Sequence, residues 1–280
     1  MKRKILFILL ASATLLSHTF SQEKVLDSAY LKCQYKYIYV KDTLELSTFE
    51  DLLLLQIGKN ISKSYSYYTF QSDSLAKEPE GQKTRSEIFN QALEKFKVHR
   101  DKTLFLNSFP RRRGTAIVYK NYPDGKITVT DNVTSDYVMY EDELNTQNWK
   151  ISDSAKIILG YSCQKAECDY RGRHWTAWFA PDIPVSDGPW KLGGLPGLIM
   201  EVYDQKKHYA FTLAGIEKVS DEPIVFSQPI DNNKYRKIER KEFLKAQWRH
   251  LSNNFISAET GMAMGVDKPV YQDLIERDYR

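Results

Sequence analysis

Short turns separate successive stretches in which apolar and polar residues alternate. Residues 31–39 alternate in this way, residues 157–168 and 174–180 flank a tight Arg-Gly-Arg turn, and residues 198–203 and 209–216 flank another short connection. Alternation with a period of two is typical of a strand with one buried face. Strands joined by only a few residues pair antiparallel, because a parallel crossover needs a dozen or more residues. The pattern therefore predicts an antiparallel meander.

Further strands are expected in the first two thirds of the chain. The segment from Asn121 to Gly125 ends in Asp-Gly, which supplies the positive φ that a tight hairpin turn needs. The 18 Tyr and 13 Phe residues of the chain suit half-buried, pleated strands. The remaining predicted strands are residues 52–57, 61–70, 115–119, 127–130, 138–140 and 149–151.

Two segments have helical rather than strand periodicity. Phe89, Leu93 and Phe96 are spaced as on one helix face, which predicts a helix over residues 86–98 packed on the sheet. The polar residues 72–81 before it predict a loop. A second helix, covering one face of the sheet, is predicted by the apolar stripe Leu244, Trp248, Leu251 and Phe255. The expected fold class is mainly β (α+β): a curved antiparallel sheet or half-barrel meander with one or two helices packed on it.

The N-terminus has the three parts of a secretory signal peptide. Three basic residues, Lys2 to Lys4, precede the apolar residues 5–16, and small or polar residues follow up to Ser21. The apolar run is shorter than the roughly 20 residues that a spanning helix needs. We expect residues 1–21 to be removed and residues 22–280 to form a single domain, periplasmic or secreted. No Cys follows the apolar run, so a lipid anchor is not expected, and no later segment is apolar enough to span a membrane.

Removal of the signal also changes the charge balance. The chain has 40 Lys and Arg residues against 36 Asp and Glu, and the signal contains three of the basic ones. The mature chain is therefore almost neutral, which gives no reason to expect nucleic acid as a partner. Arg111 to Arg113 form a basic triplet that could bind an anion, but we interpret it as a solvated loop.

Three cysteines lie in the mature part of the chain. An oxidising compartment would allow one disulfide and leave one thiol over. Cys163 and Cys168 are five residues apart, so they face opposite sides of one strand and cannot bond to each other. A disulfide from Cys33 to one of the two is therefore predicted. No Cys-x-x-Cys pair is present, so a cysteine-based metal site is not expected.

The most unusual segment runs from Gly160 to Asp204. It contains Gly-Tyr-x-Cys-x-Lys-Ala, then Arg-Gly-Arg, Ala-Trp-Phe, Ile-Pro and Gly-Pro-Trp, and ends in the hexapeptide from Gly194 to Ile199, GLPGLI. In the order and spacing of these motifs the chain resembles the GLPGLI family of exported Bacteroidetes proteins. The resemblance implies a protein of the cell envelope or its surroundings, and it implies no biochemical activity.

The turn-forming residues of this segment predict an ordered loop. Pro196 and Gly197 stand at the central positions of a predicted type II turn, in which Gly197 adopts a positive φ. Gly188-Pro189 and Gly193-Gly194 add further turns. The apolar side chains that would then enter the core are Leu195, Leu198 and Ile199. The loop over residues 181–197 could be a plug that closes one end of the sheet, or it could line a ligand cleft.

A cluster of aromatic and charged residues lies beside this loop. Tryptophan rings and arginine donors on one strand face would suit sugars, peptides or carboxylates, although tryptophans in a sheet are often core residues. The tentative ligand-binding residues are Arg171, Arg173, His174, Trp178, Asp182 and Trp190, and Trp175 and Asp187 lie among them.

The sequence favours a non-catalytic protein. No zinc-type histidine spacing, nucleophile elbow or phosphate-binding loop is present, so neither a metal nor a cofactor is expected. We expect an exported protein whose concave face binds an apolar or amphipathic ligand, or an outer-membrane partner such as a transporter. One alternative is a periplasmic hydrolase that uses His174 with Asp182 or Asp187. Another is a purely structural or interaction protein.

Overall fold

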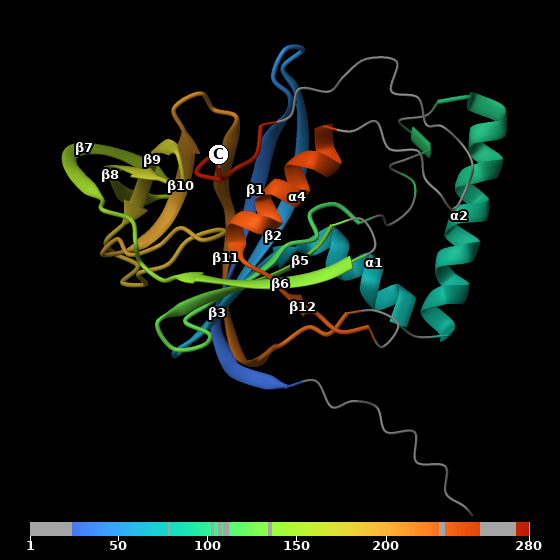
Figure 1. Ribbon diagram of the computed structural model, residues 1–280, viewed down its shortest axis with the longest axis horizontal. Coiled ribbons are helices and arrows are strands. Elements are labelled where there is room, and N and C mark those ends of the chain that lie inside the picture. Colours follow the sequence, from blue (N-terminus) through green and yellow to red (C-terminus); the bar gives the residue numbers. More distant parts are fainter. Residues whose placement is uncertain are drawn as a thin grey trace, which may run out of the picture.

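The computed structural model describes residues 24–77, 79–101, 104–105, 108, 112–133, 136–229, 233–252 and 273–279. The strands in these residues are β1 (Val25–Asp42), β2 (Ser47–Gly58), β3 (Ser62–Ser66), β4 (Ile117–Lys120), β5 (Lys126–Val133), β6 (Asp136–Glu143), β7 (Lys150–Ile158), β8 (Tyr161–Tyr170), β9 (Arg173–Ala180), β10 (Leu198–Asp204), β11 (Tyr209–Val225) and β12 (Arg236–Lys237). They form a 12-stranded sheet in the order β12-β6-β5-β4-β3-β2-β1-β11-β10-β9-β8-β7 (Figure 1). The predicted mainly β fold is confirmed.

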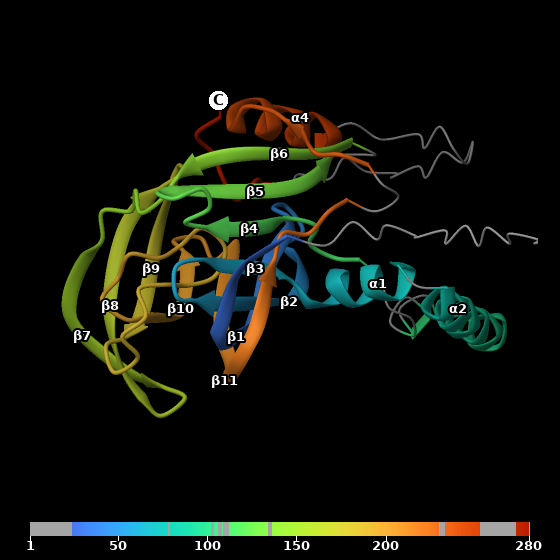
Figure 2. The same cartoon turned by 90° about the horizontal axis from the view of Figure 1, so that it is seen from below.

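Two antiparallel meanders meet along the first strand. Strands β1 to β6 lie side by side in chain order, as do β7 to β11, and the long strand β11 then pairs with β1 from Val25↔Val225 to Tyr39↔Tyr209. Each of these pairs is antiparallel, whereas the short β12 pairs with β6 in parallel. The sheet is strongly curved: β5 and β6 run across the direction of β8 and β9 (Figure 2).

Two of the predicted hairpin turns have the backbone that their residues predict. Gly125 has φ of 74° between β4 and β5. Arg171 and Gly172 have φ of 53° and 76° between β8 and β9, the left-handed pair of a tight two-residue hairpin. These local signals set the strand registers on which the rest of the sheet is built.

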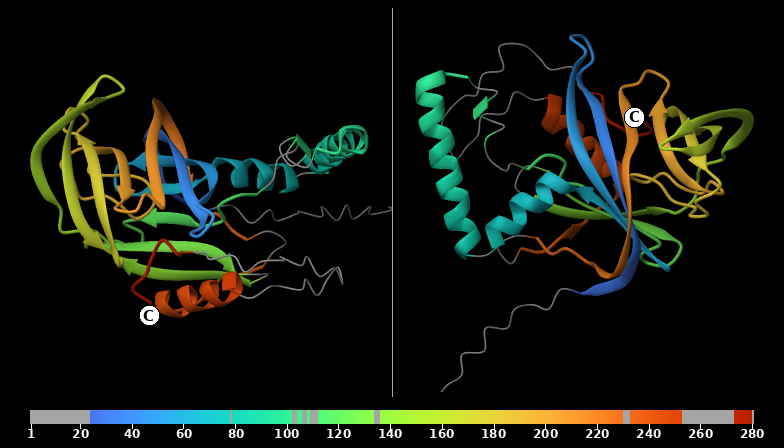
Figure 3. Two further views of the ribbon diagram at one scale, coloured as in Figure 1. Left: turned by 90° about the horizontal axis from the view of Figure 1, so that it is seen from above. Right: turned by 180° about the vertical axis from the view of Figure 1, so that it is seen from behind.

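The helix predicted near the C-terminus is present in the structure. Helix α4 (Arg240–Ser252) lies against β5 and β6, where Phe243 and Leu244 are buried (Figure 3). This confirms the predicted C-terminal helix up to residue 252. Phe255 and the signal peptide lie outside the described residues. Among the helices of the described residues, none has both the length and the apolar character to cross a membrane.

The prediction for residues 61–98 was wrong in part. After β3 the chain forms helix α1 (Tyr67–Lys77) where a strand and then a loop were expected, and α2 (Pro79–His99) follows. Helix α2 stands away from the sheet, next to α1 (Figure 1), and its one buried residue is Ala92. Phe89, which was expected to face the sheet, is 41% exposed and contacts the Phe105 ring. The apolar stripe of α2 is too weak to hold it on a core.

Two apolar clusters fill the interior. The larger is built on β1, β2 and β8 to β11, with the loop residues Leu192 and Leu195. The smaller lies between β4 to β6, α4 and the C-terminal segment 273–279. The half-buried ring of Trp190 packs against both clusters. The loop after β9 therefore joins the two halves of the interior.

Candidate functional site

Arg171 and Arg173 hold the C-terminal segment 273–279 on the sheet. The Arg173 guanidinium is buried and donates to Asp204 at 2.8 Å and to the carbonyl oxygens of Leu274 and Ile275 at 2.6 and 2.8 Å. Arg171 donates to Asp142 and to Asp278. Protein acceptors therefore already bind the guanidinium groups of Arg171 and Arg173. From the sequence, these groups were predicted to bind a ligand.

Lys191 extends the same network from the loop after β9. Its side chain has no exposed surface, and its ammonium donates to Asp142 at 2.9 Å and to Glu276. Arg240 of α4 reaches Glu276 and Asp278 from the other side. We call Asp142, Arg171, Lys191, Arg240, Glu276 and Asp278 the charge cluster. Because each carboxylate has a cation in contact, the cluster is a lock between β6, the loop, α4 and the C-terminal segment.

The acidic partners proposed for His174 lie elsewhere. The His174 Nδ1 is 2.9 Å from an oxygen of Asp169 on the neighbouring strand β8. Asp187 instead forms an ion pair with Lys120 across the interior, and Asp182 is exposed in the turn after β9. The structure thus gives His174 a carboxylate, although a different one from those expected.

The tryptophans divide between core and surface. Trp175 is fully buried and donates its indole N–H to the Tyr170 carbonyl at 3.1 Å. Trp178 lies on the opposite face of β9 with the Lys156 ammonium 4.4 Å from its ring centre. Trp190 packs 5.9 Å from the Trp175 ring. These three rings therefore form no continuous platform.

The GLPGLI hexapeptide is a packing element. Leu195, Leu198 and Ile199 are buried, as expected. The predicted type II turn was wrong, because Gly197 is not among the glycines with positive φ and its N–H bonds to the Leu195 carbonyl at 2.8 Å, a tight turn centred on Pro196. A Cβ on Gly197 would lie 2.3 Å from the Ala180 oxygen. Glycine is needed here for close backbone approach.

Glycine is required at two further positions of the loop, for a different physical reason at each. A Cβ on Gly188 would meet the Ile199 side chain at 2.8 Å, so Gly188-Pro189 seats the loop directly on the hexapeptide. Gly194 has φ of 83°, which favours glycine. Of the two alternatives for this loop, the burial of its residues favours a plug. The ring of Trp190, which belongs to the loop, also borders a cavity.

The predicted disulfide is not formed. Cys33, Cys163 and Cys168 are all buried free thiols. Cys33 lies on β1, which is separated from β8 by β11, β10 and β9 in the sheet, so neither partner is adjacent. Burial raises the pKa of Cys33 and of Cys168 to about 12. In structural terms they are small core residues.

A cavity of about 280 Å³ opens between the curved sheet and α4. Its walls come from β1, β2 and β11 on one side and from β4 to β6 on the other, so it lies on the concave face. The C-terminal residues 273–276 close one end. We call it the aromatic cavity, after its ring-bearing lining residues Tyr37, Tyr39, Tyr65, Tyr140, Trp190, Tyr209, Phe211 and Phe243.

The rings of β1 and β11 form one wall of this cavity. Tyr37 stacks on Phe211 with ring centres 4.5 Å apart and an interplanar angle of 4°. Tyr39 stacks on Tyr209 at 6.1 Å. Tyr37 and Tyr39 keep part of their surface exposed, whereas Tyr209 and Phe211 are buried beneath. The sequence predicted this alternation of tyrosines, but nothing in it placed them opposite α4.

Polar groups lie at the margins of the aromatic cavity. Asp273 accepts from Arg277 at 2.9 Å, contacts Arg173 and His208, and these partners hold its pKa well below the usual range despite its burial. Arg113 stacks 3.7 Å from the Tyr68 ring centre. At the other margin Asp131 is buried, and burial raises its pKa to about 6. A slot with aromatic walls and charged margins can accommodate an amphipathic molecule.

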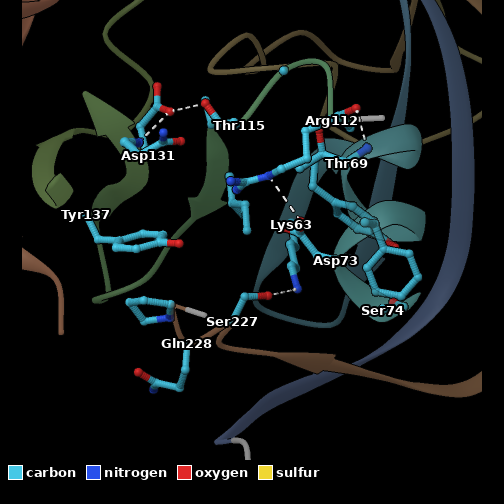
Figure 4. A pocket seen from close by; sticks show the side chains of 18 of the residues that line it. Lys63, Thr69, Asp73, Ser74, Arg112, Thr115, Asp131, Tyr137, Ser227 and Gln228 are labelled. Atoms are coloured by element: carbon cyan, nitrogen blue, oxygen red, sulfur yellow. Dashed lines mark hydrogen bonds and ion pairs between the residues drawn. The ribbon is translucent and has the colours of Figure 1, made fainter. Parts of the chain in front are cut away.

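A second hollow adjoins the first. It has a volume of about 100 Å³ and shares Tyr65, Gly114, Thr115, Ala116 and Asp131 with the aromatic cavity. Its other lining residues include both polar and apolar side chains, and Figure 4 shows several of the polar ones. Within the described residues no cluster of His, Cys, Asp and Glu has the arrangement of a metal site.

Comparisons with known proteins find one family model and several solved structures. A family model described as a protein of unknown function (Porph_ging) matches residues 171–201, which contain Arg171, Arg173, Lys191 and the GLPGLI hexapeptide. Two solved structures of PNGF-II, in the C2 and P21 space groups, are similar with TM-scores of 0.48, 13% and 12% identity, and coverage of 79% and 80% of this chain. The chain spans about a third of their length (33% and 34%). No curated protein matches. The matched segment is thus similar to a family of unknown function.

Proposed function

We propose that this protein is a non-catalytic exported binding protein whose aromatic cavity holds a small amphipathic ligand. The observation that supports this is the pair of part-exposed rings, Tyr37 and Tyr39, which face a cavity of about 280 Å³ between sheet and helix. Apolar side chains in a folded core normally fill such space. Aromatic walls with a few polar groups at the rim are typical of ligand sites.

The cavity favours a ligand with a flat or branched apolar body and a polar end. Stacked rings offer face and edge contacts to such a body. Gln247 of α4 can donate a hydrogen bond to the polar end or accept one from it, and the carboxylates at the margins can accept one. An outer-membrane partner such as a transporter, which would deliver or receive the ligand, is part of the same proposal.

The test is a binding screen that compares the wild type with a variant whose cavity is filled by a larger side chain. Thermal shift and tryptophan fluorescence are measured with the mature protein against fatty acids, aromatic acids, short peptides and glycans, because Trp190 borders the cavity. Gln247→Trp places a large ring at the half-buried, cavity-facing side of α4 and should abolish stabilisation by any hit. Lys245→Trp adds the same ring on the exposed side of the helix and serves as the matched control.

The screen distinguishes a ligand in the aromatic cavity, a ligand bound elsewhere and no ligand. Stabilisation of wild type and Lys245→Trp, but not of Gln247→Trp, supports the proposal. Hits that stabilise all three proteins equally would place the ligand elsewhere and overturn it. If no compound class stabilises the wild type, the purely structural role is favoured instead.

The hydrolase alternative rests on one contact, between His174 and Asp169 at 2.9 Å. It predicts that His174→Ala abolishes a turnover and leaves the melting temperature nearly unchanged, because both side chains are substantially exposed. Chromogenic ester and glycoside substrates provide the assay. An equal background rate in wild type and His174→Ala would remove this alternative.

Family membership and export belong to the proposal as well. The GLPGLI hexapeptide and its neighbouring motifs support assignment to the GLPGLI family, and the basic and apolar N-terminus supports secretion. N-terminal sequencing of protein isolated from the periplasm is expected to begin at Gln22. Full-length protein in the cytoplasm would contradict this.

A further inference from the structure

The small hollow beside the aromatic cavity is lined by charged groups of both signs (Figure 4). We call it the polar pocket, and its charged lining residues are Lys63, Asp73, Lys77, Arg112 and Asp131. It lies between β3, α1, the 112–117 segment, β5 and the residues after β11. None of these groups belongs to the charge cluster that holds the C-terminal segment.

Asp131 presents one carboxylate oxygen to the polar pocket. Its Oδ1 accepts from the Thr115 hydroxyl at 2.5 Å and from the Asn132 N–H at 2.7 Å. Its Oδ2 has no hydrogen-bond partner among the described residues. The positive charge of Arg112 acts on the carboxylate and lowers its pKa, against the larger effect of burial. The residue is only 8% exposed, so this oxygen has little access to water except through the pocket. A carboxylate in this position favours a donor that carries positive charge.

Arg112 supplies the opposite charge. Its side chain extends into the middle of the polar pocket (Figure 4), and its Nε lies 3.1 Å from Asp73. Within the described residues its two terminal nitrogens have no hydrogen-bond partner. A guanidinium with both terminal N–H groups open matches the fork of a carboxylate. The basic triplet seen in the sequence was interpreted there as a solvated loop. It includes Arg112, which is exposed and lines this pocket, and Arg113, which lines the aromatic cavity.

We propose that the polar pocket binds a small zwitterion, a free α-amino acid of about the size of alanine, with its ammonium on Asp131 and its carboxylate on Arg112. A ligand of one charge alone would leave the other protein group unmatched in a partly enclosed site, which is unfavourable. The volume of about 100 Å³ suits a ligand of this size, since a cavity of about 150 Å³ holds a benzene ring. Rings of Tyr65, Phe70, Tyr137 and Tyr235 border the space left for a short side chain.

The experiment divides the ligand into its two charged halves. Ligand-observed NMR on the full mature chain at neutral pH compares L-alanine with ethylamine, which has only the ammonium, and with propanoate, which has only the carboxylate. L-Alanine is expected to bind at least tenfold more tightly than either half, because each half leaves one charge-assisted contact unmade. Equal binding of alanine and propanoate, or no alanine binding at millimolar concentrations, would overturn the proposal.

Two variants assign the contacts. Asp131→Asn should lower the affinity for alanine to that for propanoate, and Arg112→Gln should lower it to that for ethylamine. Asp153→Asn and Arg249→Gln are the matched controls, since both residues are exposed and neither lines the pocket. A variant that unfolds is recognised by its NMR spectrum, and the comparison of the three ligands on wild type still decides the outcome.

Alanine binding can be tested separately from binding in the aromatic cavity, although Asp131 lines both spaces. Gln247→Trp should leave alanine binding unchanged, because Gln247 lines only the larger space. Loss of alanine affinity below about pH 6, where Asp131 becomes protonated, is a further expected result. An affinity that does not change between pH 7 and pH 5 would show that Asp131 does not hold the ammonium.

Discussion

Replacement of Lys191 by Met tests whether the charge cluster holds the fold together. The Lys191 side chain has no exposed surface, and the carboxylates of Asp142 and Glu276 are 6% and 2% exposed. Without the ammonium, both carboxylates lose a contact in a place that water hardly reaches. Breaking a buried ion pair from one side costs about 3–5 kcal/mol. At about 2–4 °C per kcal/mol for a chain of this size, the melting temperature should fall by roughly 6–20 °C.

The matched control is another lysine that pairs with a carboxylate on the surface. Lys156 contacts Glu201, and their side chains are 35% and 24% exposed. Lys156→Met should therefore cost at most about 1 kcal/mol. Urea denaturation followed by fluorescence gives both free energies of unfolding. If Lys191→Met loses no more stability than Lys156→Met, the cluster is not a structural lock.

A double-mutant cycle refines the test. Glu276→Gln removes one of the charges that Lys191 compensates, so the double variant Lys191→Met/Glu276→Gln should be less destabilised than the sum of the single variants. Limited proteolysis provides a second readout, because the C-terminal segment should become cleavable in Lys191→Met before the sheet unfolds. Strict additivity would mean that the two side chains act separately.

Three further predictions follow from local geometry. Gly197→Ala should cost about 1–3 kcal/mol because its Cβ would overlap the Ala180 oxygen, whereas Gly215→Ala on β11, where the nearest atom is 3.9 Å away, should be neutral or stabilising by up to about 1 kcal/mol; equal melting temperatures would contradict the close approach. Cys33 and the other two thiols should resist a thiol reagent in the native protein and react in denaturant, and a disulfide found by mass spectrometry would refute this. Because burial raises the pKa of Asp131 from 3.8 to about 6, its folded form takes up a proton first, so stability falls as pH rises from about 4 to about 6. Asp131→Asn should gain stability relative to wild type over that interval in urea titrations, and a constant difference would contradict the shift.

The predictions from sequence succeeded where neighbouring residues decide the structure. Alternating residues identified β1, β9, β10 and β11, and the Asp-Gly and Arg-Gly turns fixed two hairpins. The single strand predicted over residues 157–168 was wrong in part, because a turn at Leu159 and Gly160 divides it between β7 and β8. The stripe of α4 was visible because its apolar residues repeat every three or four positions. The Gly197 turn and helix α2 were predicted wrongly because both depend on contacts between residues distant in the chain. Gly197 approaches the backbone of Ala180, and Phe89 has no sheet beside it among the described residues.

The candidate sites could not be predicted from local sequence patterns, because their residues are distant from one another in the chain. The tentative ligand residues Arg171 and Arg173 proved to contact the C-terminal segment, about a hundred positions away, which showed no strong pattern of its own. Arg112 and Asp131 meet in a pocket although one stood in an apparent loop and the other in an ordinary strand.

The sequence by itself determined the class of fold, two hairpin turns and the apolar content of the GLPGLI loop, because side-chain periodicity and turn conformation depend on residues close in the chain. Only the tertiary structure decided which charges compensate one another, that the three thiols lie apart, and that the tyrosines of β1 face a cavity under α4. These depend on the pairing of β1 with β11 and on the curvature of the sheet, which bring together residues that no local rule connects.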